Sequence, residues 1–126
     1  MRNFTPHSIK IIDQKSVKFD PKIRKYTPFT DIEPVIITEF PSNGMLSGNI
    51  QTVPGEPIDN VPTYYKKVVG CDPLPDGDDM LIVSAIYAVA ARKSGLPMDR
   101  LLVIADPVVT PDGNQILGCI GVGPAM

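Results

Sequence analysis

Residues 80–94 read MLIVSAIYAVAARKS, and this stretch decides the fold class because it turns from a buried strand directly into a helix. The run 81–83 is continuously apolar, as in a strand that is covered on both faces. From Ser84 onward the alanine-rich sequence favours helix, which Gly95 and Pro97 end. We therefore expect a helix at residues 84–94 with Ser84 near its N-cap. Its apolar face is expected to comprise Ile86, Val89, Ala90 and the stem of Lys93.

The rest of the chain is predicted to form short strands. Its 14 prolines and 10 glycines exclude other long helices. A tight connection at residues 13–15 predicts a hairpin between the first two strands, and the Pro-Asp-Gly turn at residues 111–113 predicts another near the C-terminus. Residues 45–61 contain repeated glycine and proline and predict a long loop. The expected strands are 8–12, 16–19, 35–40, 63–69, 81–83, 101–104, 108–109 and 115–120.

Length and composition indicate one folded unit. A chain of 126 residues fits a single domain spanning residues 1–126, and a hydrophobic content of 43% argues against a disordered chain. The expected class is α+β: a small, mostly antiparallel β-sheet or barrel-like domain with one short helix. Neither a membrane-length apolar stretch nor a signal peptide is visible, so we expect no membrane partner and a cytoplasmic location.

Charge is distributed unevenly along the chain. Residues 1–25 contain seven Lys or Arg and two acids, giving +5, whereas residues 26–126 contain five and twelve, giving −7. The basic quarter, which includes Arg24 and Lys25, fits either a solvated hairpin whose lysines protect an edge strand or a positive patch for a phosphate-bearing ligand. Duplex DNA is disfavoured as a partner because the whole chain carries −2 and lacks a recognition-helix pattern.

Metal and nucleophile motifs are missing from the sequence. The single histidine, His7, and two distant cysteines, Cys71 and Cys119, do not match the spacings of a zinc site. The acidic turn at residues 72–79 does not match a calcium-binding loop. Ser84 lacks the glycines of a nucleophile elbow. We therefore predict no metal, no cofactor and no catalytic residue, and two reduced, buried thiols.

The N-terminal motif Asn3-Phe4-Thr5-Pro6-His7 places an amide, a hydroxyl and an imidazole within five residues. Such side chains often satisfy backbone groups in turns, so His7 fits a structural role as well as contact with a ligand. Ser84, as a helix cap, can also receive a phosphate group. The candidate ligand-binding residues are Asn3, Thr5, His7, Ser84, Arg24 and Lys25.

Several motifs together resemble a widespread family of small phage and prophage proteins. The resemblance is carried by Asn3–His7, the Pro-Ser-Asn-Gly turn at 41–44, Leu-Ile-Val-Ser-Ala at 81–85, Leu-Leu-Val-Ile-Ala-Asp at 101–106, and Asp112-Gly113 leading to Gly118-Cys119. It spans most of the chain and implies a phage origin, with the host cytoplasm as location. Family members commonly carry arginines where this sequence has 45–47 and Ile120, and no catalytic residue is carried over.

Three functions are compatible with the sequence. The first is a non-enzymatic protein that binds a nucleotide-type small molecule and sequesters a host nucleotide immune signal. The second is an interaction or virion-associated protein without a small-molecule ligand. The third is a phosphodiester hydrolase that uses His7 as general acid or base. A homo-oligomer is expected because a small β domain leaves sheet edges that a second copy can cover.

Overall fold

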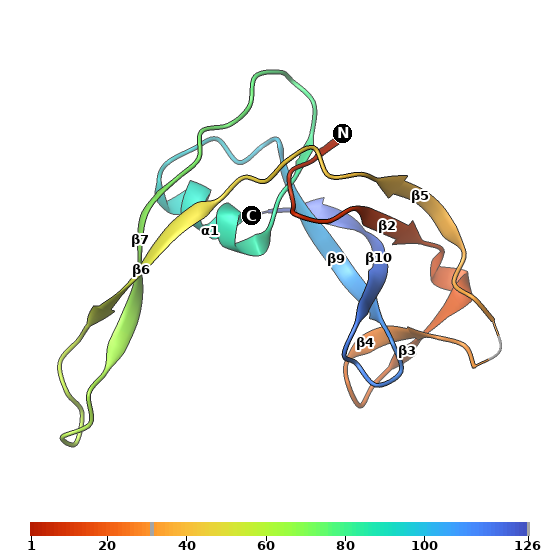
Figure 1. Cartoon of the computed structure of the whole chain (residues 1–126), viewed down its shortest axis with the longest axis horizontal. Helices are drawn as coiled ribbons and strands as arrows, with labels where there is room; N and C mark the ends of the chain where they lie inside the picture. The colour runs from red at the N-terminus through yellow and green to blue at the C-terminus, as the bar shows by residue number, and fades with distance from the viewer. Residues whose placement is uncertain (31, 126) are drawn as a thin grey trace.

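The computed structural model describes residues 1–30 and 32–125 as an arch (Figure 1). The arch is built from ten strands, a short 3-10 helix and one α-helix. In chain order these are β1 (Arg2–Asn3), β2 (Ile9–Ile12), η1 (Gln14–Ser16), β3 (Val17–Asp20), β4 (Lys25–Pro28), β5 (Ile36–Phe40), β6 (Gly48–Pro54), β7 (Tyr64–Cys71), β8 (Leu81–Ile82), α1 (Ala85–Lys93), β9 (Leu101–Val109) and β10 (Ile116–Pro124).

The main sheet has the order β1-β8-β9-β10-β2-β5, and the β3–β4 hairpin joins it through β9. The β1–β8, β8–β9, β4–β9 and β10–β2 pairs are parallel, whereas β9–β10, β2–β5 and β3–β4 are antiparallel. The α+β class with one helix is therefore confirmed. The expectation of a mostly antiparallel sheet is wrong, because β1, β2, β4 and β8 reach parallel neighbours that are distant in the sequence.

Helix α1 begins where the sequence predicted, and the Ser84 side chain accepts a hydrogen bond from the backbone N–H of Tyr87 (3.1 Å). Its buried face differs from the prediction in part: Ala90 is buried as expected, but Ile86 and Val89 are not. Tyr87 and three alanines are buried, whereas Ile86 is 60% exposed and Val89 is 49% exposed. Tyr87 turns inward because its ring fills the core beside Leu81 and Leu101, while its hydroxyl donates to the Asp72 carbonyl (2.9 Å).

Two further predictions are wrong: the hairpin between the first two strands and the end of a strand at residue 104. The first two strands do not form a hairpin, because η1 redirects the chain after Asp13, whose side chain accepts from the Lys15 N–H. Consequently β2 pairs with β5 and β10, and β3 pairs with β4. The predicted strand 101–104 continues to Val109, because β9 stays paired with β10 on both sides of Asp106 although Asp106 adopts a φ of 51°.

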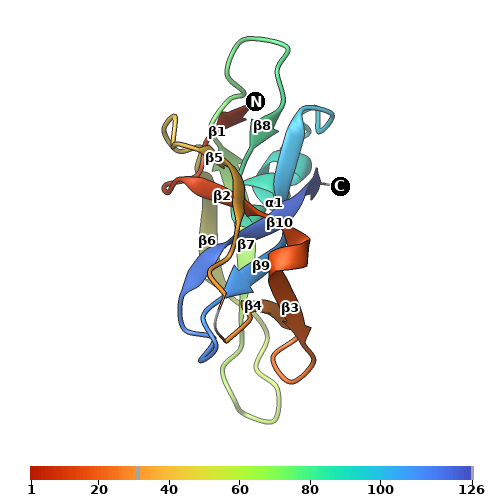
Figure 2. The ribbon, with the colours of Figure 1, turned by 90° about the vertical axis from the view of Figure 1, so that its right-hand side faces the viewer.

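Residues 45–61 were expected to form a long loop, but they contain strand β6. This strand pairs with β7 in an antiparallel two-stranded ribbon that is separate from the main sheet. We call this ribbon, residues 48–71, the arm. Its base packs on α1, where a Cβ at Gly48 would lie 2.6 Å from the Ala90 Cβ. The remainder projects from the body and forms one end of the arch (Figures 1 and 2).

The described residues form two hydrophobic clusters. The larger one lies where α1 covers the sheet, and the smaller one lies toward the β3–β4 end of the arch. The larger cluster comprises Leu46, Leu81, Val83, Tyr87, Ala88, Ala91 and Leu101. The smaller one comprises Ile12, Val17 and Val108. Both cysteines are free; Cys119 is buried as predicted, but Cys71 is partly exposed. Among the described helices, none has the length and apolar character needed to cross a membrane.

Candidate functional site

A cleft of about 610 Å³ lies at the junction of the N-terminal motif, the start of α1 and the β9–β10 strands. Thr5, His7 and Ser84, three of the predicted ligand-binding residues, contribute to its walls. The cleft is lined by residues 5–10, 83–85, 103–104 and 116–119. The structure thus brings together side chains that lie more than 70 positions apart in the sequence.

The lining of the cleft combines apolar and polar side chains. Val83, Val103, Ile104, Ile116 and Leu117 supply aliphatic surface. The polar side chains come from Thr5, His7, Ser8, Lys10 and Ser84. A ligand that fits this lining has an apolar or aromatic part and a polar, hydrogen-bonding part.

Electrostatics at the cleft favour an anion. Lys10 is the one Lys or Arg among the described lining residues, and no Asp or Glu is among them. The N-terminus of α1 also meets the cleft at Ser84 and Ala85, where the helix dipole places partial positive charge. A bound anion would therefore meet an imidazole, an ammonium group and a helix N-terminus. A neighbouring carboxylate in the fold is that of Glu39, which stands opposite Lys10 in the β2–β5 pair and accepts a hydrogen bond from the Ser8 hydroxyl (3.1 Å).

Asn3, by contrast, has no free group to offer a ligand. It is fully buried, and its amide Nδ2 donates to the carbonyls of His7 (2.9 Å) and Phe40 (3.0 Å). Its Oδ1 accepts from the backbone N–H (3.0 Å) and hydroxyl (2.6 Å) of Thr5. The predicted ligand contact is therefore wrong for this residue: Asn3 fixes the turn that carries Thr5 and His7 into the cleft wall.

Arg24 and Lys25 also lie outside the cleft. Arg24 lies in the turn of the β3–β4 hairpin and Lys25 is the first residue of β4, at the end of the arch opposite the arm (Figure 1). Lys10 of the same basic quarter does line the cleft, although it was not selected. The sequence showed that Lys10 follows His7 by three residues in an expected strand. It did not show that β10 pairs with this strand and contributes residues 116–119 to the same cleft.

Strand β10 approaches β2 closely at Gly118. A Cβ there would lie 2.5 Å from the Lys10 carbonyl oxygen and 2.8 Å from Ile12 Cδ1. Because glycine has no side chain, β10 can approach β2 closely enough to pair with it beside the cleft. This pairing positions the Lys10 backbone. Gly118 is therefore a supporting residue of the cleft, a role that the sequence analysis did not predict.

Cys119 lines the same cleft as His7 but is a poor nucleophile. It is 1% exposed, and burial raises the pKa of its thiol. Reactive cysteines have lowered pKa values that expose a thiolate near neutral pH. A thiol kept protonated by burial opposes the chemistry of a Cys–His pair.

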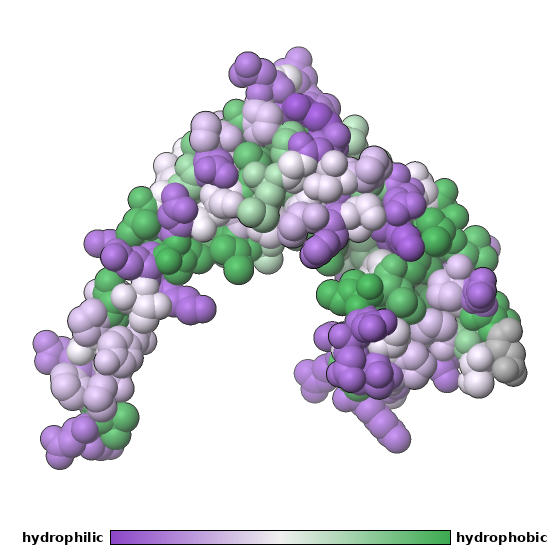
Figure 3. All heavy atoms as spheres, in the orientation of Figure 1, coloured by the Kyte–Doolittle hydropathy of each residue, from purple (hydrophilic) through white to green (hydrophobic). Residues whose placement is uncertain are grey.

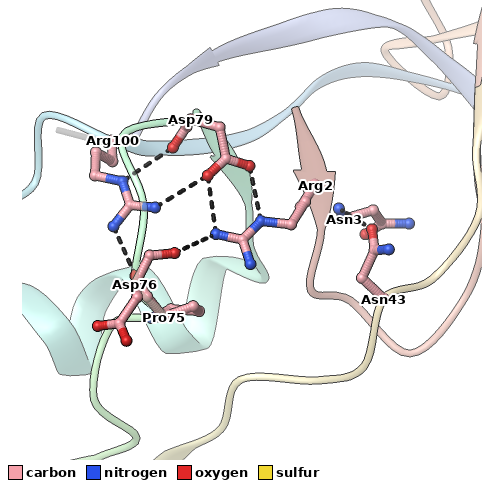
Figure 4. A network of polar contacts seen from close by, with 7 residues as sticks. All are labelled: Arg2, Asn3, Asn43, Pro75, Asp76, Asp79 and Arg100. Carbon is pink, nitrogen blue, oxygen red and sulfur yellow. Dashed lines mark hydrogen bonds and ion pairs between the residues drawn. The ribbon is translucent and has the colours of Figure 1, made fainter.

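The acidic turn at residues 72–79 is held by two arginines (Figure 4). Arg2 donates to both Asp79 carboxylate oxygens (2.7 and 2.8 Å) and to the Asp76 carbonyl (2.7 Å). Arg100 donates to the carbonyls of Pro75 and Asp79 (2.8 and 2.9 Å) and to the Asp79 carboxylate (3.2 Å). The hydrogen bond from Arg2 lowers the pKa of Asp79 to about 2. The network ties β1 to the turn, which gives the carboxylate a structural role.

No cluster of three or more His, Cys, Asp or Glu suited to a metal ion occurs within residues 1–30 and 32–125. No protein-family model, curated protein or solved structure was found to match the chain. The chemistry of the cleft therefore has to indicate the function.

Proposed function

We propose that this protein binds a small anionic ligand with an apolar or aromatic part, of nucleotide type, in the cleft between β2, β10 and the N-terminus of α1. The observation that carries the proposal is the composition of the lining: His7, Lys10 and the N-terminus of α1 share the cleft with aliphatic side chains. The neighbouring Glu39 carboxylate is hydrogen-bonded to the Ser8 hydroxyl (3.1 Å). A volume of about 610 Å³ lies within the range of small-molecule sites.

The ligand is retained unchanged in this proposal. Catalysis by His7 would need a second reacting group in position, and the thiol in the same cleft is kept protonated by its burial. Binding without turnover is compatible with sequestration of a host nucleotide immune signal by a phage protein in the host cytoplasm. That finer role draws on the sequence resemblance and on the charge of the cleft.

The test is a binding and release experiment. The purified protein is incubated with cyclic oligonucleotides and ADP-ribose-derived nucleotides, separated from free ligand and heated, and the supernatant is analysed by mass spectrometry. Intact nucleotide released only on heating supports sequestration. Converted nucleotide would instead support the phosphodiester hydrolase, and absence of any bound nucleotide would favour an interaction or virion-associated protein.

A matched pair of lysine variants locates the site. We expect Lys10→Gln to weaken nucleotide binding about tenfold, since a charge-assisted hydrogen bond contributes about 1.5–3 kcal/mol. Lys15→Gln removes the same charge from an exposed position outside the cleft and is expected to leave affinity within about twofold, because exposed charges are screened by salt. Equal losses in both variants would contradict the proposed site.

A further inference from the structure

The arm carries large apolar side chains that stay exposed in the part of the chain that the structure describes, residues 1–30 and 32–125. Ile58 and Val61 at its tip are 66% and 60% exposed, and Tyr64, Tyr65 and Val69 of β7 are each more than half exposed. An isolated two-stranded ribbon is marginally stable in water at best. The arm therefore needs a surface to lie against.

The total exposed surface points to a second copy of the chain. The folded chain exposes 8340 Å², whereas a compact monomer of 13.7 kDa exposes about 6,600 Å². The excess of about 1,700 Å² is twice the share of about 800 Å² that one partner contributes to a standard interface. Association through the two ends of the arch would remove much of this excess.

The end of the arch opposite the arm offers a groove. It has a volume of about 670 Å³ and is lined by residues of the β3–β4 hairpin and of the segment that follows β4, among them the apolar Phe29 and Ile32 and the charged Lys18, Asp20 and Glu33. Phe29 and Ile32 are 39% and 57% exposed. Hydrophobic side chains at this end and on the arm are separated by the opening of the arch (Figure 3).

The two ends carry opposite charge. The arm tip, residues 55–63, contains Glu56 and Asp59 and no Lys or Arg, giving −2. At the other end, residues 18–30 and 32–34 contain four Lys or Arg, most of them at the turn of the β3–β4 hairpin, against Asp20 and Glu33, giving +2. Complementary potentials of this kind favour the paired arrangement and speed its formation.

We propose that the arm tip of one copy docks into the β3–β4 groove of a second copy, with Ile58 and Val61 against Phe29 and Ile32. A two-fold axis perpendicular to the view of Figure 1, below the arch, brings each arm to the partner's β3–β4 end. The two-fold axis repeats this contact, so that each arm tip meets the partner's groove and the assembly closes as a dimer. It gives Arg24 and Lys25 a role in association.

Charge exchange tests the contact. The arm variant combines Glu56→Lys with Asp59→Asn, since asparagine tolerates the φ of 51° at this position. The hairpin variant combines Lys22→Glu with Lys25→Glu. We expect sedimentation to give the wild type twice the mass of one 13.7 kDa chain, and each variant to raise the dimer Kd at least about tenfold at low salt. A chain that carries both sets of changes is expected to recover the dimer.

A charge-matched control and one crosslinking measurement complete the test. Asp78→Lys with Asp99→Asn changes the net charge as the arm variant does, at exposed positions away from both ends, and is expected to remain dimeric. Carbodiimide crosslinks between isotopically distinguishable copies are expected to join Glu56 or Asp59 to Lys18, Lys22 or Lys25. A monomeric wild type, an oligomer indifferent to the arm variant, or failure of the combined chain to recover would each overturn the proposal.

Discussion

Replacement of Asn3 tests whether this buried amide builds the cleft wall or contacts the ligand. In Asn3→Ala the Phe40 carbonyl and the Thr5 N–H lose their side-chain partner, whereas the Thr5 hydroxyl still reaches the His7 carbonyl at 3.0 Å. Two part-buried backbone groups that lose this partner, at about 1–2 kcal/mol each, predict a loss of about 2–4 kcal/mol in the free energy of unfolding. Total stabilities are commonly about 5–15 kcal/mol, so this loss is readily measured.

The isosteric Asn3→Asp change separates polarity from shape. Its second oxygen would replace an amide nitrogen that lies 2.9 and 3.0 Å from two carbonyl oxygens. At neutral pH the carboxylate faces those oxygens without a proton, so Asn3→Asp should be less stable than Asn3→Ala. Burial of the carboxylate raises its pKa in the folded state. The deficit should therefore grow as pH rises above the unfolded pKa and shrink in acid, where a protonated carboxyl can donate.

Urea unfolding, analysed by linear extrapolation at several pH values, provides the measurement. Asn49, an exposed residue of β6, gives the control, and its Ala and Asp variants should lie within about 0.5 kcal/mol of the wild type. The reasoning is refuted if Asn3→Ala is equally stable as the wild type but loses nucleotide binding. It is also refuted if Asn3→Asp is the more stable of the two Asn3 variants at neutral pH.

Three further perturbations test the supports of the cleft and the acidic turn. Ser84→Ala should lower the free energy of unfolding by about 1 kcal/mol through loss of the helix cap, and Ser84→Asp should retain most of it, as thermal or urea unfolding can show. Gly118→Ala should lower it by about 1–3 kcal/mol because the new Cβ meets a backbone oxygen of β2 at 2.5 Å. Gly121→Ala, whose Cβ meets nothing within 4 Å, should have little effect, and equal losses in both glycine variants would count against the close strand approach. Asp79 has a folded pKa lowered to about 2 from 3.8, so its stabilising contribution is complete above the unfolded pKa and is lost as pH falls through the folded one. The free energy of unfolding of Asp79→Asn should therefore depend less on pH than that of the wild type between pH 3.8 and about 2. The same pH dependence in both proteins would contradict the stabilising role of the Arg2–Asp79–Arg100 network.

Local sequence was sufficient where neighbouring residues decide the structure. The switch from an apolar run to alanine-rich sequence located α1, and Ser84 marked its start because a cap acts on N–H groups only two or three residues away. Alternation and β-branched residues located most strands within a few positions. The β9–β10 turn was visible because its geometry depends on consecutive residues.

Pairing and orientation depended on partners that are distant in the sequence. Nothing local to residues 45–61 shows that β6 finds β7 or that Gly48 lies against α1. The sequence pattern assigned Ile86 and Val89 to the buried face, whereas the tertiary structure buries Tyr87, whose hydroxyl finds the Asp72 carbonyl.

The candidate site shows the same division. Thr5, His7 and Ser84 could be selected from residue type and local context, and the structure places all three at one cleft. Asn3 was predicted on the same grounds, but its side-chain amide is fully hydrogen-bonded to backbone groups of its own turn and of β5. The sequence by itself determined which side chains carry hydrogen-bonding and ionisable groups. Only the tertiary structure decided which remain free to meet a ligand, because burial and hydrogen-bond partners arise from strands brought together across the whole chain.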